Sequence, residues 1–214
     1  MVQAGSQDLA VAQELGGDAV SAMLADRAVT AAAMPGPCPV IETSRLVLRP
    51  HRMQDADAIA TSLGDFAVAR MLTRVPVPYD REDGRDWLNM VTSGLKPDWH
   101  FAITLDGVHV GVVSLELRHG LWNVGYWLNR FYWGKGLMSE AVDAALERFF
   151  RRMAGIEIAS GAFADNPASR RVLEGRGFRV IGMRDVYSKA RGQMVPLVEM
   201  RLGQTDFATR THKP

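Results

Sequence analysis

The chain has 214 residues, of which 47% are apolar and 23% charged, a composition typical of one folded domain with an appendage. Its 25 basic and 24 acidic residues give a net charge of +1, which argues against nucleic-acid binding, because phosphate contacts need a basic excess. The single cysteine, Cys38, excludes an internal disulfide and fits a reducing compartment.

Neither membrane insertion nor metal binding is expected. No apolar run approaches the roughly 20 residues that span a bilayer, and the first residues lack the basic region of a signal peptide. The five histidines do not have the spacing of metal ligands, so no metal site is predicted. These features together predict a cytoplasmic protein.

The chain divides into three predicted segments. Residues 1–40 form an N-terminal extension, helical or disordered, that closes with the proline-rich linker "MPGPCP". A folded domain is predicted over residues 41–204, and a C-terminal tail over 205–214. The domain opens with "TSRLVLRPH", where Leu46 and Leu48 alternate with other residues as in a strand. "MQDADAIATSLGD" and "DREDGRDWLNMVTSGL" then predict two helices.

The middle of the domain begins with three predicted strands, "HFAITLDG", "VHVGVVSLELRHG" and "WNVGYWLN". Asp106-Gly107 between the first two favours a short hairpin. Residues 137–150 are predicted to be a helix with a buried stripe at helical spacing. The stripe consists of Met138, Val142, Ala145 and Phe149. The strand "IEIASGAF", the helix "DNPASRRVLEGRGF" capped by Asn166, and a closing hairpin follow. This order indicates an α+β fold with a mostly antiparallel sheet.

The turn Trp133-Gly134-Lys135-Gly136-Leu137 joins a strand to the long helix. Backbone amides at a helix start are unpaired and carry the positive end of the dipole. Glycines allow a bulky anion to approach them, so the turn is predicted to hold a pyrophosphate. Neither a P-loop nor a dinucleotide fingerprint fits in detail. Taken alone, the stretch also fits a glycine hinge without a ligand.

Two longer motifs carry a family resemblance. "NVGYWLNRFYWGKGLMSEA", followed by "ADNPASRRVLEGRGF", resembles the GNAT superfamily of N-acetyltransferases. The opening "IETSRLVLRPHRMQDADAI" is most similar to its Rim-type branch, which includes ribosomal-protein N-terminal acetyltransferases. The resemblance covers roughly residues 41–202. It implies a central mixed sheet of about seven strands flanked by about four helices. It also implies acetyl-CoA as cosubstrate and direct acetyl transfer to a primary amine.

The resemblance also implies the residues that hold the cofactor. The pantetheine arm would pair with the main chain of the strand that contains Tyr126, Trp127 and Leu128. The pyrophosphate would be held by backbone amides of the following turn and helix start. These belong to Trp133, Gly134, Lys135, Gly136, Leu137 and Met138. Asn166 and Ser169 match positions where side chains commonly contact the cofactor arm or its sulfur.

Two positions depart from the family pattern. Phe131 stands where an arginine or glutamine often begins the glycine turn. Leu173 stands where many members carry a tyrosine that acts as acid to the leaving thiolate. Ser169 is therefore the preferred acid candidate, with Tyr187 as the second. A strand amide near Tyr126 or Trp127 is a candidate oxyanion donor.

Glu116 is the preferred candidate for the base. Strand alternation places Glu116 with Ser114 and Arg118 on the polar face of its strand. There it could take a proton from the ammonium or attract a cationic acceptor. The alternative is a solvated glutamate paired with Arg118. His100, His119 and Asp185 are weaker candidates, in a list that the sequence alone leaves open.

The acceptor and the assembly remain open at this level. A protein N-terminus, a free amino acid and another small amine are all candidate acceptors, since a near-neutral charge favours none of them. A catalytically degenerate module that binds acyl-CoA and regulates a partner is the alternative, because Leu173 replaces the expected tyrosine. A homodimer is also considered.

Overall fold

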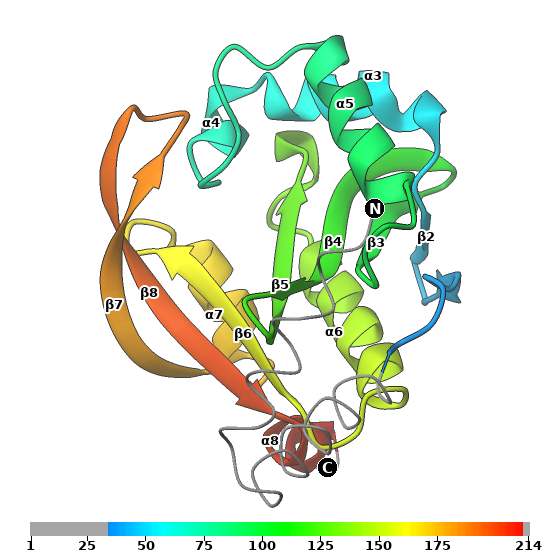
Figure 1. The fold of residues 1–214 in the computed structure, drawn as a ribbon, viewed down its shortest axis with the longest axis vertical. Coiled ribbons are helices and arrows are strands. Elements are labelled where there is room, and N and C mark those ends of the chain that lie inside the picture. The colour runs from blue at the N-terminus through cyan, green and yellow to red at the C-terminus, as the bar shows by residue number, and fades with distance from the viewer. Residues whose placement is uncertain (1–33, 212–214) are drawn as a thin grey trace, which may run out of the picture. The chain divides into compact units, whose positions relative to one another are not determined.

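The structure, a computed structural model, describes residues 34–211, so residues 1–33 of the predicted extension lie outside the described residues. An eight-stranded sheet with the order β1-β2-β3-β4-β5-β6-β8-β7 forms its centre (Figure 1). The strands are β1 (Ile41–Glu42), β2 (Leu46–Pro50), β3 (Trp99–Leu105), β4 (Val108–Arg118), β5 (Leu121–Leu128), β6 (Glu157–Phe163), β7 (Arg179–Ser188) and β8 (Gln193–Gly203). All neighbours are antiparallel except β5 and β6.

Six α-helices accompany the sheet in the described residues. They are α3 (Ala56–Leu63), α4 (Phe66–Ala69), α5 (Arg81–Thr92), α6 (Leu137–Phe150), α7 (Pro167–Glu174) and α8 (Gln204–Thr211), with the short 3₁₀ helices η1 (Met53–Asp55) and η2 (Arg130–Tyr132). The predicted α+β class with a mostly antiparallel sheet is confirmed. The count of about seven strands misses only the two-residue β1, and the count of about four helices misses the one-turn α4 and α8.

Local signals set most of these elements. Asp106 and Gly107 both have positive φ, 49° and 79°, which is the backbone of a type I′ hairpin turn. His119 and Gly120 repeat it before β5, with φ of 51° and 76°. Asp80 caps α5 by accepting hydrogen bonds from two first-turn amides. The predicted hairpins and helix starts are therefore found where the turn and cap residues stand.

Two clusters of apolar side chains place helices on both faces of the sheet. The larger cluster lies between the sheet and α6, and it contains the whole predicted stripe of that helix. The smaller one lies under α3 and α5. Along β5 the side chains alternate, because Tyr126 and Leu128 pack with the first cluster and Trp127 with the second. β5 thus presents one set of side chains to each face.

The sheet is weakly joined between β5 and β6. These strands run parallel and pair only at Trp122 with Ile158 and at Asn123 with Ala159. Beyond that point they diverge (Figure 1). The main chain of β5 after Asn123 therefore borders a gap rather than a neighbouring strand on that side.

Both ends of the described segment pack on the domain. The Trp99 indole donates to the carbonyl of Gly36 at 2.8 Å, so the proline-rich linker is attached there. The residues predicted as a C-terminal tail begin as α8, whose Phe207 is buried and packs on the ring of Phe150. Within residues 34–211, no helix combines the length and apolar character needed to cross a bilayer.

Candidate active site

The glycine turn ends at a helix without a side-chain cap. Gly134 and Gly136 have φ of 74° and 73°, a conformation that side chains other than glycine rarely adopt, so the backbone alone requires glycine. Asp80 and Asn166 cap α5 and α7, whereas Gly136 at the α6 N-cap supplies no side-chain acceptor. The first amides of α6 are therefore left to a ligand or to water.

The turn from β1 to β2 clamps the start of α6. The carboxylate of Glu140 accepts hydrogen bonds from Thr43 Oγ1 at 2.6 Å, Ser44 Oγ at 3.0 Å and the Arg45 amide at 2.9 Å. Arg45 also donates through Nε to Glu140 and through Nη1 to the carbonyl of Lys135 at 2.9 Å. Burial acts to raise the pKa of Glu140, but these hydrogen bonds outweigh it and lower that pKa to about 2. The clamp thus places an ionised carboxylate, bonded to Arg45, beside the glycine turn.

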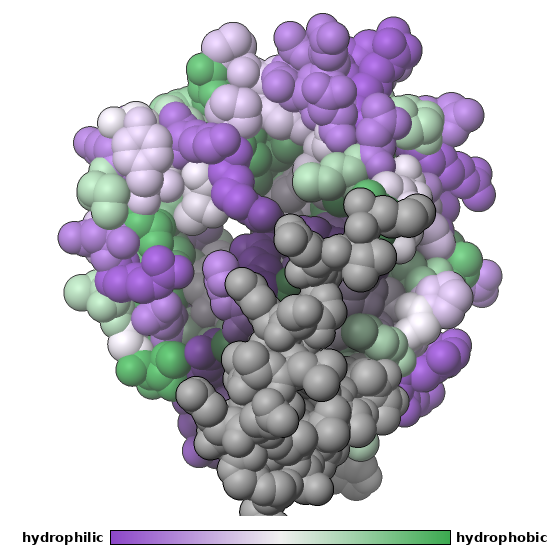
Figure 2. All heavy atoms as spheres, in the orientation of Figure 1, coloured by the Kyte–Doolittle hydropathy of each residue, from purple (hydrophilic) through white to green (hydrophobic). Residues whose placement is uncertain are grey.

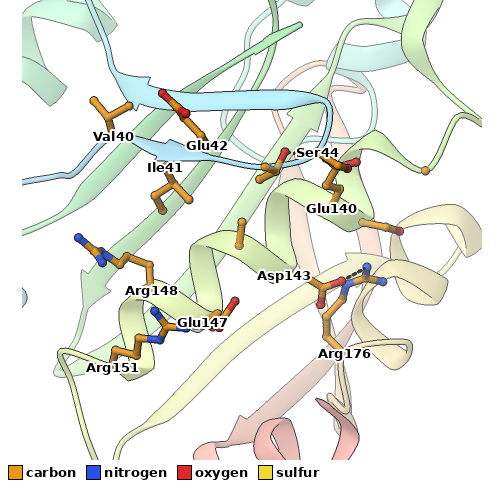
Figure 3. Close-up of a pocket in the computed structure, with 14 residues that line it drawn as sticks. Val40, Ile41, Glu42, Ser44, Glu140, Asp143, Glu147, Arg148, Arg151 and Arg176 are labelled. Carbon is orange, nitrogen blue, oxygen red and sulfur yellow. Dashed lines mark hydrogen bonds and ion pairs between the residues drawn. The ribbon is translucent and has the colours of Figure 1, made fainter. Parts of the chain in front are cut away.

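A cavity of about 780 Å³ runs along the outer side of α6 from this clamp (Figure 3). It is lined by Val40, Ile41, Glu42, Thr43, Ser44, Gly136, Ser139, Glu140, Asp143, Ala144, Glu147, Arg148, Arg151 and Arg176. Arg176 reaches into it from beyond α7 and pairs with Asp143 at 2.6 Å. Of the predicted cofactor residues, only Gly136 lines this cavity, at its end nearest the turn.

The main chain of Tyr126 faces the gap between β5 and β6. The carbonyl of Val124 accepts from Ser160 of β6 at 3.0 Å, and that of Leu128 accepts from the Trp133 indole at 2.8 Å. Main-chain groups two residues apart in a strand point to the same side, so the N–H and C=O of Tyr126 also point toward β6. No pairing of β5 with β6 extends to Tyr126. An extended ligand could pair with it there.

The side chain of Tyr126 meets the predicted acid candidate. Its hydroxyl lies 3.0 Å from Ser169 Oγ and donates to the Ser169 carbonyl at 3.1 Å. Burial raises the pKa of Tyr126 to about 12, although the Ser169 hydrogen bond acts against it. Asn166 Oδ1 accepts from the Ser169 amide at 3.0 Å and so begins α7. Two hydroxyls therefore stand together beside the gap.

Glu116 is engaged by two arginines. Its carboxylate lies 2.6 Å from Arg118 and 3.2 Å from Arg74, and it accepts from Ser114 Oγ at 2.9 Å. Burial acts to raise the pKa of Glu116, but the charges of Arg118 and Arg74 outweigh it and lower that pKa to about 2. A carboxylate with so low a pKa is a weak proton acceptor at neutral pH. The pairing with Arg118, the sequence-level alternative, is present.

The other acid and base candidates lie apart from this constellation. Tyr187 is in β7 with 57% of its surface exposed, and Asp185 is exposed in the same strand. His119 occupies the exposed turn between β4 and β5. His100 lies near Glu116 but is buried, and burial lowers its pKa to about 4. The structure brings Tyr126, rather than Tyr187, to the hydroxyl of Ser169.

The loop after α4 is tied to the turn between β7 and β8. Arg191 in that turn donates to the carbonyl of Arg70 at 2.7 Å and pairs with Asp165 at 2.8 Å. The Lys189 amide donates to the carbonyl of Thr73 at 3.0 Å. Figure 2 shows a hollow between the β7–β8 hairpin and β5, with hydrophilic side chains around it. These ties fix one wall of the hollow.

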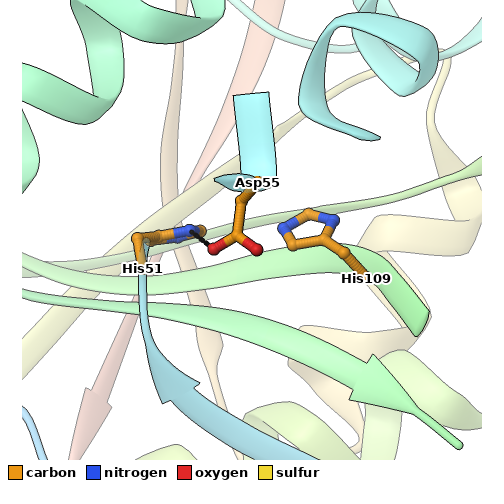
Figure 4. Close-up of side chains that lie close together, drawn as sticks. All are labelled: His51, Asp55 and His109. Atoms are coloured by element: carbon orange, nitrogen blue, oxygen red, sulfur yellow. Dashed lines mark ion pairs between the residues drawn. The ribbon is translucent and has the colours of Figure 1, made fainter. Parts of the chain in front are cut away.

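A buried polar cluster under α5 could be mistaken for a metal centre. His51, Asp55 and His109 each offer a ligand atom, and these atoms lie within 4.8 Å of one another (Figure 4). However, both oxygens of Asp55 already accept from Arg49, at 2.7 and 2.9 Å. A divalent cation would lie against this guanidinium, which disfavours it. Asp98, His100 and Glu116 form a second group of this kind. There the carboxylate of Glu116 already pairs with Arg74 and Arg118. The expectation that no metal binds stays a prediction.

Several residues of the site were missed from the sequence because their partners are far away in the chain. Arg45 and Glu140 are 95 residues apart, and Arg191 and Arg70 are 121 apart. The family resemblance implies a role for the main chain of Tyr126 and none for its hydroxyl, which the structure places beside Ser169. Strand alternation does put the side chain on the α6 face, so that signal was present in the sequence.

Comparisons with known proteins agree with this architecture. Residues 45–179 match the family described as Acetyltransferase (GNAT) domain. The chain is 25% identical over 173 residues to the N-acetyltransferase p20 of Bacillus licheniformis, covering 78% of this chain and 97% of that protein. RimJ of Mycobacterium smegmatis in complex with CoA-disulfide is 22% identical, with a TM-score of 0.66 and coverage of 75% of this chain and 83% of that one. The ribosomal-protein-S5-alanine acetyltransferase of Vibrio fischeri is 21% identical, with a TM-score of 0.65 and coverage of 82% and 100%.

The family match covers more than half of the chain, and the solved structures share its fold. The resemblance seen in the two sequence motifs is therefore confirmed, and with it the expected dependence on acetyl-CoA. The chain belongs to the GNAT family and is an acetyl-CoA-dependent N-acetyltransferase.

Proposed function

We propose that the protein transfers the acetyl group of acetyl-CoA directly to the α-amine of a protein or peptide N-terminus. The observation that carries the proposal is the gap between β5 and β6, bordered by the main chain of Tyr126 and by the hydroxyl pair of Tyr126 and Ser169. A peptide acceptor is supported by one protein of the same fold, the ribosomal-protein-S5-alanine acetyltransferase of Vibrio fischeri.

The cofactor residues fall along one path in this proposal. The Tyr126 carbonyl and the Leu128 amide pair with the pantetheine arm at the open edge of β5. The main chain of Trp127, the third predicted position, faces β4 opposite Val112 instead.

The amides of residues 134–138 hold the pyrophosphate at the uncapped start of α6. The Trp133 amide, predicted with them, donates instead to the Arg130 carbonyl at 3.2 Å. Asn166 and Ser169 lie at the thioester end. When bound, acetyl-CoA supplies an activated carbonyl that a neutral amine can attack.

Three groups of the chain act on the reaction. The Tyr126 amide donates to the carbonyl oxygen as it gains negative charge. The Ser169 hydroxyl donates a hydrogen bond to the sulfur as the carbon–sulfur bond breaks, and Tyr126 supports it. Glu116 does not take the proton, because its pKa is about 2; its carboxylate instead fixes Arg74 and Arg118 on the acceptor side of β4. The ammonium loses one proton to water before it attacks, and the proton that the nitrogen sheds as the amide forms passes through water to the departing thiolate, which leaves as the free thiol.

The acceptor is tested with a matched peptide panel. Peptides with a free N-terminus, the same peptides with a blocked N-terminus, free amino acids and small polyamines are each incubated with acetyl-CoA. Thiol release and the product mass are measured. We expect transfer to free N-termini and none to the blocked controls. Transfer to small amines alone would contradict the peptide acceptor. Binding of acetyl-CoA without transfer to any amine would favour the regulatory module instead.

The cofactor path is tested by calorimetry with acetyl-CoA. Gly136→Trp should remove binding, but its φ of 73° also strains any replacement. Ser139→Trp offers a second variant, because Ser139 lines the same end of the cavity from within α6, where a side chain is already present. We expect both variants to lose binding while thermal unfolding stays cooperative. Unchanged affinity in both would contradict the placement at this turn.

A cytoplasmic location and a homodimer complete the proposal. The acetyltransferase of Vibrio fischeri is named for a ribosomal protein, which supports a cytoplasmic location. The edge strand β7 supports a dimer, because it exposes Val180, Ile181 and Met183 at the end of the sheet. Light scattering of the purified full chain measures the mass directly. A monomer at all concentrations would contradict the dimer.

A further inference from the structure

We propose that Arg45, on the turn between β1 and β2, is a positioning residue for the phosphates of acetyl-CoA. It would shape the Lys135–Gly136 turn and supply the positive charge beside it. The inference rests on the cofactor path proposed above.

Arg45 contacts the backbone of the Lys135–Gly136 turn directly. Arg45 Nη1 donates to the Lys135 carbonyl at 2.9 Å, and a Cβ at Gly136 would lie 3.6 Å from Arg45 Nη2. The guanidinium therefore packs directly on the backbone whose amides face the cofactor. Because the guanidinium donates to the carbonyl of the Lys135–Gly136 peptide, it fixes the orientation of that peptide.

The guanidinium of Arg45 is itself held in place by Glu140. Its Nε donates to Glu140 Oε2 at 2.7 Å, and its Nη2 lies 2.6 Å from the same oxygen. Thr43 and Ser44 hold the other oxygen of that carboxylate. A guanidinium pinned at three nitrogens loses little further entropy on meeting a phosphate. The N–H groups of Nη1 and Nη2 that these contacts do not use are left for an anion.

The other cationic side chains near the turn are engaged elsewhere. The Lys135 ammonium lies over the ring of Tyr132, 5.3 Å from its centroid. Arg130 reaches the carboxylate of Asp65. Phe131, which begins the turn, is 83% exposed and uncharged. Among these side chains, Arg45 is the cation that contacts the backbone of the turn. It joins the chain's N-terminal strand region to a site built mainly from β5 and α6.

The experiment compares acetyl-CoA affinity by calorimetry on the full chain. Arg45→Gln is expected to weaken binding roughly 10- to 100-fold, the range of a lost charge-assisted hydrogen bond. Arg184→Gln is the matched control, because it also removes an exposed arginine paired with a glutamate, Glu199 of β8, and Arg184 does not line the cavity beside α6. We expect the control to bind as the wild type does. Equal affinity in Arg45→Gln and wild type would overturn the inference.

Two further arms separate phosphate binding from structural effects. Binding of S-acetylpantetheine, a thioester without phosphates, is measured by competition, and Arg45→Gln should leave it unchanged. The double variant Arg45→Gln/Glu140→Gln should stay as weak toward acetyl-CoA as the single one. Recovery in the double variant would mean that Arg45 only neutralises Glu140, and would overturn the inference. An equal loss for both thioesters would overturn it as well.

A wrong role for Arg45 can be told apart from a wrong placement of the cofactor. If the path is wrong, Gly136→Trp and Ser139→Trp bind acetyl-CoA normally. If only the inference is wrong, these two variants lose binding while Arg45→Gln keeps it. The salt dependence of the affinity gives an independent readout, since Arg45→Gln should make it shallower than in the wild type.

Discussion

The hydroxyl pair of Tyr126 and Ser169 shows how a hydroxyl group missing from one element can be supplied by another. Leu173 of α7 is fully buried in the core, so no hydroxyl comes from that position. The Tyr126 hydroxyl reaches the first turn of α7 from β5 instead. Since burial raises its pKa to about 12, the phenol stays protonated at neutral pH. It can therefore orient the Ser169 hydroxyl without ionising.

Removing this hydroxyl should affect turnover more than cofactor affinity. In Tyr126→Phe the ring is retained, while the hydrogen bonds to Ser169 are lost. We expect kcat to fall about 10-fold, the value of roughly one hydrogen bond of 1.4 kcal/mol. The KM for acetyl-CoA should change little, because the main chain of β5 is intact. Steady-state kinetics measure both constants. A rise in that KM with unchanged kcat would contradict a role at the sulfur.

Glu116 gives a prediction for the pH dependence of the rate. Its pKa of about 2 keeps the carboxylate ionised throughout the working range. Glu116→Gln should therefore leave the apparent pKa of the kcat/KM profile unchanged, while the KM for the amine acceptor rises. Profiles of the two proteins between pH 6 and 9, at saturating acetyl-CoA, provide the measurement. Loss of the acidic limb in the variant would identify Glu116 as the base.

At the residue level, the sequence predicts what lies close in the chain. Asn166 and Ser169 are three residues apart, and their hydrogen bond follows from the helix start they form. Arg118 and Glu116 lie on one face of a strand, and they pair as alternation allows. The second partner of Glu116, Arg74, comes from a loop 42 residues earlier. No local pattern specifies such a contact, because it depends on how the elements pack.

At the level of elements, α7 owes its start to the Asn166 side chain. Its Oδ1 accepts from the Ser169 amide, and Pro167 occupies the first helical position. Asn166→Ala should lower the free energy of unfolding by about 1 kcal/mol, the usual value of an N-cap. Asn166→Asp keeps an acceptor oxygen and serves as the control. Urea unfolding of the three proteins measures the difference, and equal midpoints would contradict the cap.

The elements divide into those that the sequence predicts and those that it does not. The hairpin at Asp106-Gly107 and the helix over residues 137–150 follow from turn chemistry and periodicity, and both are found. β1 is two residues long, too short for a periodic signal. The parallel joint of β5 with β6 is also absent from local patterns, since it brings together strands separated by all of α6.

For the whole molecule, the buried His51 and His100 and the partly buried His109 predict loss of stability in mild acid. Burial lowers the pKa of His51, and it lowers those of His100 and His109 to about 4. In the unfolded chain a histidine has a pKa of about 6.5. Between these values the unfolded state binds more protons than the folded state. Folding stability should therefore be complete above about pH 6.5 and fall as the pH drops toward 4.

The test measures urea unfolding at pH 7.5 and pH 5. Each of these histidines contributes up to about 1.4 kcal/mol per pH unit within the window. His109→Gln should reduce the difference between the two pH values. His119→Gln is the control, because His119 lies in an exposed turn. Equal stability at both pH values in the wild type would contradict the prediction. The ionised pairs of Asp55 and Glu116 add to acid sensitivity only at lower pH.

The short joint between β5 and β6 has a consequence for how the domain responds to its cosubstrate. With only two paired positions, β5 and β6 are unpaired over most of their length. A pantetheine arm that hydrogen-bonds to β5 there takes the place of a neighbouring strand and pairs main-chain groups that are otherwise left open. Occupancy should then slow amide hydrogen exchange in β5, and in the Ser160 region that faces it, more than in β2, which lies three places away in the sheet. Substrate supply would in this way also regulate how firmly the two halves of the enzyme are held together.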